Sequence, residues 1–286
     1  MTSLPIKIGA AAAMPLSVGV HRTAIIESGA QLGVGVDIGP WCHIGPNVSI
    51  GDRVRLVSHV VVDGETHVGE GAVLYPFCTV GLAPQDLKYK GEATRCEIGA
   101  RTQIREHCTI HRGTVTGSGI TRVGADCLLM AVVHVAHDCE IGDGVVIANN
   151  VVMGGHVSIG ADAVIGGAAA LHQFVRIGRG AMVGGVSGVE ADVIPFGSVI
   201  GNRARLSGMN VIGLRRRGVD RAGLHTLRTA MRRLFGTVGV FSMRLADVRA
   251  AYAEDPLVTE ILAFIDAPSK RGLIRTAVGA MEEDAS

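Results

Sequence analysis

The chain has 286 residues and a net charge of +1, which excludes a strong overall attraction to nucleic acid, so any basic site must be local. It contains 40 glycines and 48% hydrophobic residues, yet only 3% of its residues are aromatic. A core of this composition is built from small and branched side chains, which indicates a narrow interior.

An apolar side chain recurs every six residues through most of the chain, over residues 8–80, 98–110 and, after a shift of one position, 123–189. Neither the 3.6-residue period of a helix nor the two-residue period of a strand produces a strict period of six. Small residues lie two positions earlier, on the same inward face, and glycine often follows, where the chain must turn. The repeat predicts a parallel β-helix with three faces and about eighteen residues per coil, so that residues eighteen apart are stacked neighbours.

The N-terminal segment is only faintly similar to a secretory signal, because its apolar part is short and broken by prolines. The hexads begin at Ile8, so we expect this segment to form the first coil and to be retained. All six cysteines lie two positions before an apolar hexad position, and we expect them to fill the core as free thiols. A reducing, cytoplasmic location follows. No run of eighteen apolar residues exists, so no membrane span is expected.

Two interruptions of the repeat predict loops that leave the β-helix, at residues 81–97 and 113–122. Long excursions from a regular solenoid are commonly functional. The repeat fails from about Pro195, so we expect residues 1–200 to form the β-helix domain. The remaining residues, 201–286, are expected to form an α-helical domain that covers the exposed end of the solenoid.

Helical spacing of apolar residues predicts a helix after Asp220, which is a suitable N-cap, and before Gly236. Two shorter helices are expected at residues 245–252 and 257–265. Between residues 203 and 235 there are nine arginines and one acidic residue. This basic segment is either a solvated helix face or a site for phosphates or for an acidic protein.

Histidines gather along one edge of the predicted prism. His134 and His137 flank one apolar hexad position, His156 follows in the next coil, and His172 and Gln173 follow in the coil after that. With coils about 4.8 Å apart, these side chains fall within about 10 Å. Four of the eleven histidines on one edge indicate a surface site rather than solvent-exposed residues without a function.

The residues around His137 suggest acid–base chemistry. A neutral imidazole can take a proton from a hydroxyl as that hydroxyl attacks a carbonyl, and Asp138 could orient the ring if the turn brings the two together. Gly155, one coil above His137, has a backbone N–H that no side chain shields, which makes it a candidate oxyanion donor. Metal ligands must converge on one point, and histidines on successive coils are not expected to converge, so no metal or cofactor is predicted.

Six motifs carry a resemblance that covers nearly the whole chain. They are PQDLKYKGE (84–92), TIHRGT (109–114), LLMAVVHVAHDC (128–139), GGHVSIG (154–160), LHQF (171–174) and GLRRRG (213–218). In this order they are similar to those of the UDP-N-acetylglucosamine acyltransferases that start lipid A biosynthesis. The hexads themselves resemble those of the wider superfamily of left-handed β-helix acyltransferases.

The resemblance implies a left-handed helix, a homotrimer and the transfer of a 3-hydroxyacyl chain from acyl carrier protein to the 3-hydroxyl of UDP-N-acetylglucosamine, in a cleft between subunits. It implies that His137 is the general base, with Asp138 supporting it and Gly155 in the oxyanion role. Gly185 matches the position that limits acyl length and implies room for a long chain. Substrate binding is implied for Asp86, Lys88, His134, His156, His172, Gln173, Asn210, Arg216 and Arg217.

Two positions differ from some members of the family: Arg203 stands where some have a histidine near the acyl tail, and Ile212 stands where some have a glutamate beside the nucleotide. They concern the acyl length and the nucleotide contacts, not the residues of the acid–base chemistry. Three alternatives remain open. One is the related N-acyltransferase, expected to carry a separate N-terminal domain; another is a metal-dependent hydratase of the γ-carbonic anhydrase kind; the third is a non-catalytic trimeric scaffold.

Overall fold

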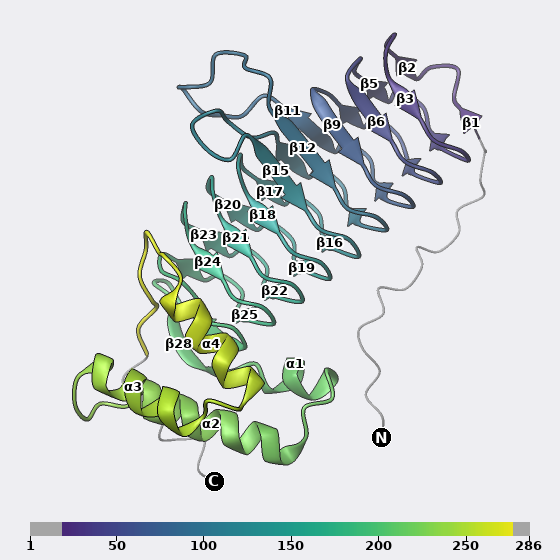
Figure 1. Ribbon diagram of the computed structural model, residues 1–286. Helices are drawn as coiled ribbons and strands as arrows, with labels where there is room; N and C mark the ends of the chain where they lie inside the picture. The colour runs from purple at the N-terminus through teal and green to yellow at the C-terminus, as the bar shows by residue number, and fades with distance from the viewer. Residues whose placement is uncertain (1–18, 277–286) are drawn as a thin grey trace.

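The computed structural model describes residues 19–276 as a three-sided parallel β-helix followed by a group of helices at one end (Figure 1). The first coil expected at Ile8 lies outside the described residues. Within residues 19–276, no helix is both long enough and apolar enough to cross a bilayer.

Three sheets form the sides of the prism, and the chain visits them in the order A, B, C in every coil. Sheet A contains β1 (Gly19–Val20), β4 (Asp37–Ile38), β7 (Arg55–Leu56), β10 (Val73–Leu74), β13 (Gln103–Ile104), β16 (Leu128–Leu129), β19 (Val146–Ile147), β22 (Val164–Ile165), β25 (Met182–Val183), β27 (Gly197–Ile200) and β28 (Arg205–Met209). Sheet B contains β2 (Ile25–Ile26), β5 (His43–Ile44), β8 (Val61–Val62), β11 (Thr79–Leu82), β14 (Thr109–His111), β17 (His134–Val135), β20 (Val152–Met153), β23 (Ala170–Leu171) and β26 (Gly188–Val189). Sheet C contains β3 (Gln31–Leu32), β6 (Val48–Ile50), β9 (Glu65–Val68), β12 (Arg95–Ile98), β15 (Ile120–Val123), β18 (Glu140–Ile141), β21 (Ser158–Ile159) and β24 (Arg176–Ile177).

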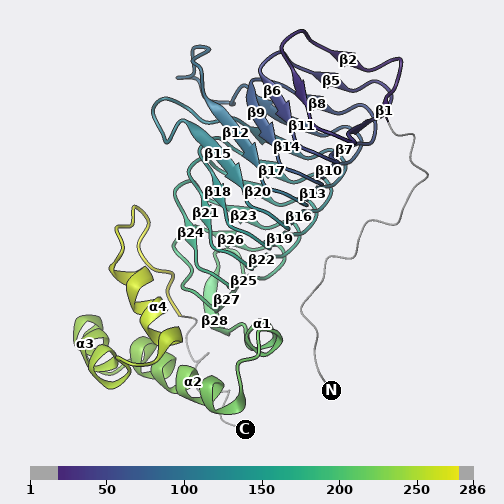
Figure 2. The ribbon, with the colours of Figure 1, turned by 45° about the vertical axis from the view of Figure 1, so that its right-hand side comes forward.

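The strand register confirms the coil of eighteen residues. Asp37 pairs with Arg55, and His134 pairs with Val152, both eighteen positions apart and parallel. The hexad side chains fill the narrow interior; Ile38 and Leu129, for example, are fully buried. All six cysteines are buried and free, as predicted. The stacked coils are visible along the helix axis in Figures 1 and 2.

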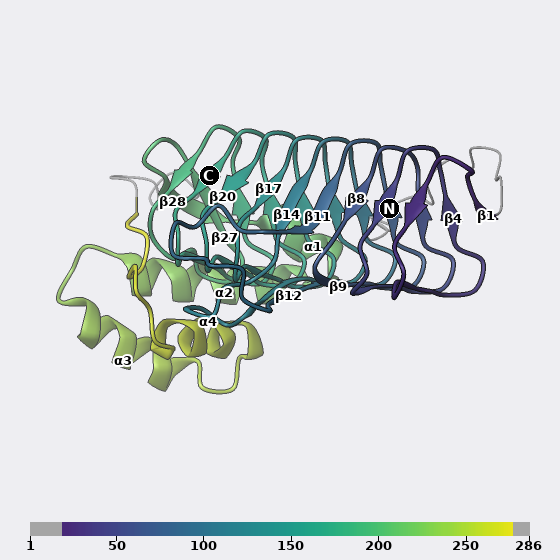
Figure 3. The same ribbon diagram turned by 90° about the horizontal axis from the view of Figure 1, so that it is seen from above.

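The three corners of the prism are named here by the sheets they join. Both excursions from the solenoid leave at the B–C corner: residues 83–94 connect β11 to β12, and residues 112–119 connect β14 to β15. Figure 3, which views the molecule from above, shows both loops on the same side of the solenoid. His137 follows β17 and precedes β18, so it lies at this corner too.

The helical part begins at residue 211, after β28 has paired antiparallel with β27. It comprises α1 (Val211–Arg216), α2 (Arg221–Phe235), α3 (Phe241–Ala251) and α4 (Pro256–Asp266). The cap predicted for α2 is confirmed, since the Asp220 carboxylate accepts a hydrogen bond from the Gly223 N–H. Helix α1 was not predicted, because it is too short to show a helical period, and α3 begins four residues before the predicted start.

After α4 the chain returns to the β-helix as a C-terminal strap, residues 267–276. Backbone bonds anchor it: the Asp192 N–H donates to Gly272 O at 2.8 Å, the Ile274 N–H donates to Asp192 O at 2.9 Å, and the Leu206 N–H donates to Arg275 O at 3.0 Å. The buried Asp192 carboxylate in turn holds the guanidinium of Arg176. The strap is therefore held against the last coils of the solenoid, at Asp192 on the B–C side and at Leu206 of β28.

Candidate active site

The B–C corner brings together the residues that form the catalytic ridge, defined here as His134, His137, Asp138, Gly155, His156 and Gln173. The coils stack in the expected register, because the His156 N–H donates to His137 O at 3.0 Å and the Phe174 N–H donates to Gly155 O at 3.1 Å. The His137 ring lies directly over Gly155. A Cβ at residue 155 would stand 2.5 Å from His137 Cε1 and 2.7 Å from its Nε2, so only glycine allows this approach.

Asp138 is a buried carboxylate at the centre of the ridge, and its backbone takes the left-handed conformation, φ 58°. Five donors reach it: the Thr114 N–H and hydroxyl, the Ser118 hydroxyl, the Gly119 N–H and His137 Nδ1. Burial alone would raise the pKa of Asp138, but the hydrogen bonds from Thr114 and His137 outweigh it and hold that pKa below its ordinary value. The carboxylate therefore stays ionised near neutral pH.

The bond between His137 and Asp138 fixes which ring nitrogen is the base. His137 Nδ1 lies 2.8 Å from Asp138 Oδ2. An ionised carboxylate only accepts, so Nδ1 must carry the proton and the lone pair must reside on Nε2. The His137 side chain is 17% exposed, against 1% for Asp138. This is the arrangement of a general base with an orienting acid.

A metal could contact three of these groups, because ligand atoms of His137, Asp138 and His156 lie within 4.8 Å of one another. The expectation that histidines on successive coils do not converge was therefore wrong, since the turn at Asp138 and the short coil spacing bring them together. The carboxylate of Asp138, however, has roughly four lone-pair sites, and its five hydrogen-bond donors already occupy them. No lone pair of Asp138 is then left for a metal ion. The donor set fits a hydrogen-bonded dyad rather than a metal centre.

His156 lies between two rings. It meets the His137 ring edge-on, with centroids 5.1 Å apart, and stacks on the Phe174 ring with centroids 4.4 Å apart and planes 7° apart. Its Nδ1 is 3.9 Å from Asp138 Oδ2. Burial lowers the pKa of His156 most, and the attraction of Asp138 offsets this only in part. His156 is thus a neutral imidazole beside the dyad near neutral pH.

His134 faces outward from β17, and its Nδ1 lies 2.7 Å from the Thr109 hydroxyl. The sequence analysis missed its neighbour His111, whose ring meets His134 edge-on at 5.0 Å and is 6% exposed. Burial, with repulsion from His134 and His137, lowers the pKa of His111 to about 4, and burial lowers the pKa of His134. The only signal for His111 was its place in the TIHRGT motif.

Asp86 and Lys88 lie on the 83–94 excursion, where the Asp86 carboxylate accepts a hydrogen bond from the Lys88 N–H at 2.9 Å. Asp86 is close enough to the ridge for its charge to raise the pKa of His156. The Lys88 side chain is exposed. The excursion therefore carries both residues to the same corner as the histidines.

His172 and Gln173 extend the ridge by one coil and meet the C-terminal strap. Arg271 contacts the His172 ring, and its Nε donates to Gln173 O at 2.8 Å. Neither this contact nor that of Lys270, whose Nζ is 4.0 Å from the Phe174 ring centroid, was foreseen from the sequence. Nothing in the local pattern of residues 267–276 marks them as part of a site.

Four of the candidate substrate-binding residues lie at other corners. Gly185 follows β25 and therefore lies at the A–B corner, where a Cβ would stand 3.3 Å from Gly167 O. The side chain of Asn210 caps α1 and donates to Gly180 O at 2.9 Å, which places it at the C–A corner. Within a single chain, Gly185 and Asn210 therefore lie at different corners from the histidines of the ridge.

The arginines of the GLRRRG motif also lie by the C–A corner. Arg217 Nη2 donates to Asp162 O at 2.8 Å, and Arg217 Nε pairs with the Asp162 carboxylate at 3.3 Å. Arg217 is therefore partly engaged in holding α1 against the solenoid. Arg216, the last residue of α1, is exposed.

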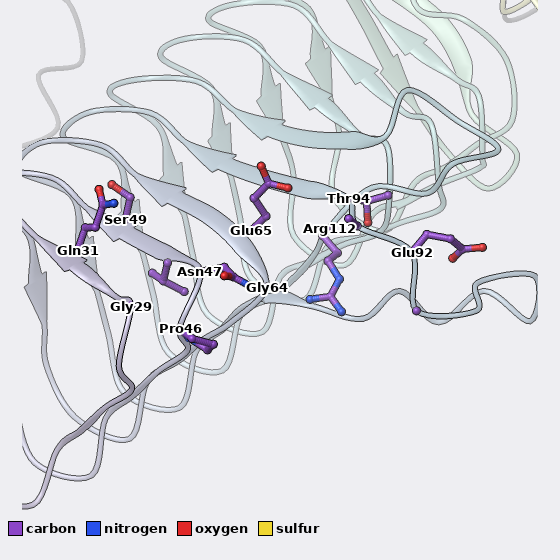
Figure 4. A pocket seen from close by; sticks show the side chains of 13 residues that line it. Gly29, Gln31, Pro46, Asn47, Ser49, Gly64, Glu65, Glu92, Thr94 and Arg112 are labelled. Atoms are coloured by element: carbon purple, nitrogen blue, oxygen red, sulfur yellow. The ribbon is translucent and has the colours of Figure 1, made fainter.

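A separate cavity of about 650 Å³ lies along the B–C corner in the N-terminal coils, beside the 83–94 excursion (Figure 4). Arg112, at one end, is fixed by the Tyr89 hydroxyl at 2.9 Å and by Gly81 O at 3.1 Å. None of the ridge histidines lines it. Its polar lining includes Gln31, Asn47, Ser49, Glu65, Glu92, Thr94 and Arg112.

The solenoid of hexapeptide repeats places the chain in the class of hexapeptide-repeat transferases. Residues 120–155 match the family described as bacterial transferase hexapeptide (six repeats), and residues 192–274 match UDP N-acetylglucosamine O-acyltransferase; domain 2. The chain is 44% identical, over 89% of its length and 93% of the relative's, to the acyl-[acyl-carrier-protein]--UDP-N-acetylglucosamine O-acyltransferase of Rhizobium johnstonii. The chain belongs to the UDP-N-acetylglucosamine O-acyltransferase family.

Solved structures agree with this assignment. The UDP-N-acetylglucosamine O-acyltransferase of Moraxella catarrhalis superposes with a TM-score of 0.84 at 42% identity, covering 90% of this chain and 99% of that one. The UDP-N-acetylglucosamine acyltransferase of Arabidopsis superposes with a TM-score of 0.80 at 34% identity, covering 90% and 100%. The fold predicted from the hexads, a left-handed parallel β-helix with C-terminal helices, is confirmed.

Proposed function

We propose that this protein transfers a 3-hydroxyacyl chain from acyl carrier protein to the 3-hydroxyl of UDP-N-acetylglucosamine, the first step of lipid A biosynthesis. Sequence identity of 44% to the Rhizobium O-acyltransferase over most of both chains supports the reaction. The observation that carries the chemistry is the His137–Asp138 dyad, whose imidazole ring lies directly over the buried backbone of Gly155.

In this reaction His137 Nε2 takes the proton of the sugar hydroxyl as its oxygen attacks the thioester carbon. The carbonyl oxygen becomes an oxyanion, and the Gly155 N–H donates to it. The C–S bond then breaks, and the imidazolium returns the proton to the departing thiolate of the carrier. Asp138 stabilises the imidazolium throughout. The products are an ester and the free carrier thiol.

The remaining ridge groups are suited to binding. Neutral His134 and His156 offer both donors and acceptors to sugar and amide groups. Asp86, Lys88, His172 and Gln173 surround the same corner and complete the polar lining of the site. Their assignment to particular substrate groups follows the family motifs in which they occur.

The distribution of the other candidates over different corners supports a homotrimer. Sheet C carries outward charges, such as Glu97 paired with Arg122 at 3.0 Å, whereas sheet A presents Val164 and Met182 and sheet B presents Val152, which is 48% exposed. If sheet B of one subunit faces sheet A of the next, the B–C corner of one lies opposite the C–A corner of the other. Asn210, Arg216 and Arg217 of the neighbour would then reach the nucleotide.

Mixing two inactive variants tests this shared site. His137→Ala and Arg216→Met would be denatured together and refolded, so that mixed trimers contain some intact interfaces. We expect acyl transfer to recover to a measurable fraction of the wild-type rate. Each variant refolded alone is the control, and the absence of recovery in mixed trimers of verified mass would contradict the shared site.

Gly185 at the A–B corner is proposed to limit acyl length, with a glycine leaving room for a long chain. Gly185→Met should shift preference toward shorter chains, because the new side chain would extend from an exposed corner into the space along the interface. Competition between 3-hydroxyacyl carriers of different lengths measures this shift. An unaltered length profile would remove Gly185 from the acyl site.

The alternatives drawn from the sequence are not favoured. The relatives are O-acyltransferases, which argues against an amine acceptor. The hydrogen bonds on Asp138 argue against a metal-dependent hydratase. A cytoplasmic location is proposed from the six buried free thiols, which suit a reducing compartment.

One assay tests the proposed function directly. Purified protein is supplied with UDP-N-acetylglucosamine and a panel of 3-hydroxyacyl carriers, and the ester product is measured. We expect one length class to be transferred. Transfer only to an amine acceptor, such as a 3-amino variant of the sugar, would contradict the proposal, as would activity that depends on added zinc.

A further inference from the structure

The C-terminal strap reaches the catalytic ridge through a row of four side chains. Lys270 Nζ lies 4.0 Å from the centroid of the Phe174 ring. The His156 ring already occupies one face of Phe174, at 4.4 Å and nearly parallel, so the ammonium must lie over the other face. His156 in turn meets His137 edge-on at 5.1 Å. A cation from residue 270 is thus linked to the proposed base through two rings.

Each contact in this row restricts its neighbour. An ammonium over an aromatic face is attracted by the ring quadrupole. Phe174 takes φ 68°, a conformation that bulky residues rarely adopt, and such conformations persist where surrounding contacts enforce them. The same turn recurs in most coils, as at Trp41 and Phe77, so Lys270 and His156 restrict the position of the Phe174 ring rather than its backbone. The strap itself is fixed by its backbone bonds to Asp192 and Leu206.

We propose that Lys270, acting through Phe174, is a positioning residue for acyl transfer: it holds the His156 ring in place beside the His137–Asp138 dyad and sets a positive charge on the far side of the Phe174 ring. This inference rests on the proposed function. A second contact of the same strap supports the proposal. Arg271 contacts the His172 ring and Gln173 O, one coil beyond His156. The strap is thereby part of the site rather than only a closure of the fold.

The charge on His156 matters because a protonated ring would compete for Asp138. The two groups are 3.9 Å apart, and Asp138 is the acceptor that fixes the proton of His137 on Nδ1. A second positive charge would also repel the imidazolium that forms on His137 during the proposed transfer. An uncharged His156 therefore leaves Asp138 to His137 alone.

Four charged or titratable groups face His156. Burial is the largest influence on the pKa of His156, and it lowers that pKa. Among the nearby charges, Asp138 and Asp86 raise the pKa of His156, whereas His137 and Lys270 lower it. Removing the positive charge of Lys270 therefore raises the pKa of His156. His156 would then take up a proton at a higher pH than in the native protein.

The test is the pH profile of kcat/KM in Lys270→Met, which keeps a flexible apolar side chain but loses the cation. We expect the acidic limb to move to higher pH by a few tenths of a unit, with an approximately two-fold loss of kcat/KM on that limb. Lys270→Arg should restore the native profile. Arg53→Met, which removes a cation at the far end of the solenoid, is the matched control and should leave the profile unchanged.

A titration of the His156 side chain by NMR tests the same point without turnover, with the resonance assigned by its loss in His156→Gln. A raised His156 pKa in Lys270→Met supports the proposal even if the acyl substrate has been assigned wrongly, because the titration needs no substrate. The titration therefore distinguishes a failure of this proposal from a failure of the proposed function. Phe174→Leu, which removes the ring between cation and imidazole, should shift His156 in the same direction. An unchanged titration and an unmoved acidic limb in Lys270→Met would overturn the proposal.

Discussion

Two corners of the same solenoid carry stacked rings, yet only one of them carries a dyad. At the A–B corner, Trp41, His59, Phe77 and His107 occupy the left-handed position of successive coils, with neighbouring ring centroids 6.5, 4.9 and 4.9 Å apart. At the B–C corner, His156 and Phe174 occupy the corresponding position. The repeat places histidines at both corners, so a histidine at a turn is not by itself a base.

The difference lies in what surrounds the rings. His59 and His107 are exposed and contact other rings. At the B–C corner, a buried carboxylate fixes the tautomer of His137, and the 112–119 excursion supplies the donors that hold the carboxylate. Both excursions and the C-terminal strap lie on this side. The solenoid thus supplies spacing, and the irregular segments supply the chemistry.

Asp138→Asn should have the largest effect, a fall in kcat of at least about 100-fold, as loss of an orienting carboxylate allows the wrong tautomer of the base. The amide can donate to His137 Nδ1, which moves the proton to Nε2. Steady-state kinetics with circular dichroism as a folding check measure this. Asp126→Asn is the matched control, because Asp126 has φ 57° at the C–A corner and pairs only with an exposed arginine; equal losses in both variants would contradict the account.

Gly155→Ala should lower kcat by roughly 10- to 100-fold, because misplacing a reacting group by about 1 Å costs that much. The added methyl would stand 2.5 Å from His137 Cε1, so the ring must move. At the equivalent A–B position, Gly167→Ala meets its nearest atom at 3.4 Å and should retain most activity. Full activity of Gly155→Ala would show that the ring position over Gly155 is unimportant.

The buried His111 predicts a pH dependence of stability. Its pKa is lowered to about 4 in the folded protein, against about 6.5 when unfolded, so the unfolded chain binds more protons between these values. Stability should therefore fall as the pH decreases through this window, and the part of the fall that lies between pH 7.5 and pH 5 should be on the order of 2 kcal/mol. Urea unfolding of His111→Gln at pH 7.5 and pH 5 should show a smaller decrease than wild type; an equal decrease would contradict the assignment.

The regular part of the molecule could be predicted from the sequence because its period is strict. The hexads gave the coil length, the buried cysteines and the stacking of His137, Gly155 and Gln173, and Asp220 gave the start of α2. The contacts of Thr114 and Ser118 with Asp138 could not be predicted, because they depend on how a loop without a period folds back. The same holds for Lys270, which reaches Phe174 across 96 positions of the sequence.

The most direct test of the account compares His137→Ala with His59→Ala in the same acyl-transfer assay. Both variants remove an imidazole from a corner of the solenoid, but only one removes a ring bonded to a buried carboxylate. The account predicts a fall in kcat of about 100-fold or more for His137→Ala, as for loss of a general base, and little change for His59→Ala. Near-native turnover by His137→Ala, or an equal loss in both variants, would contradict it.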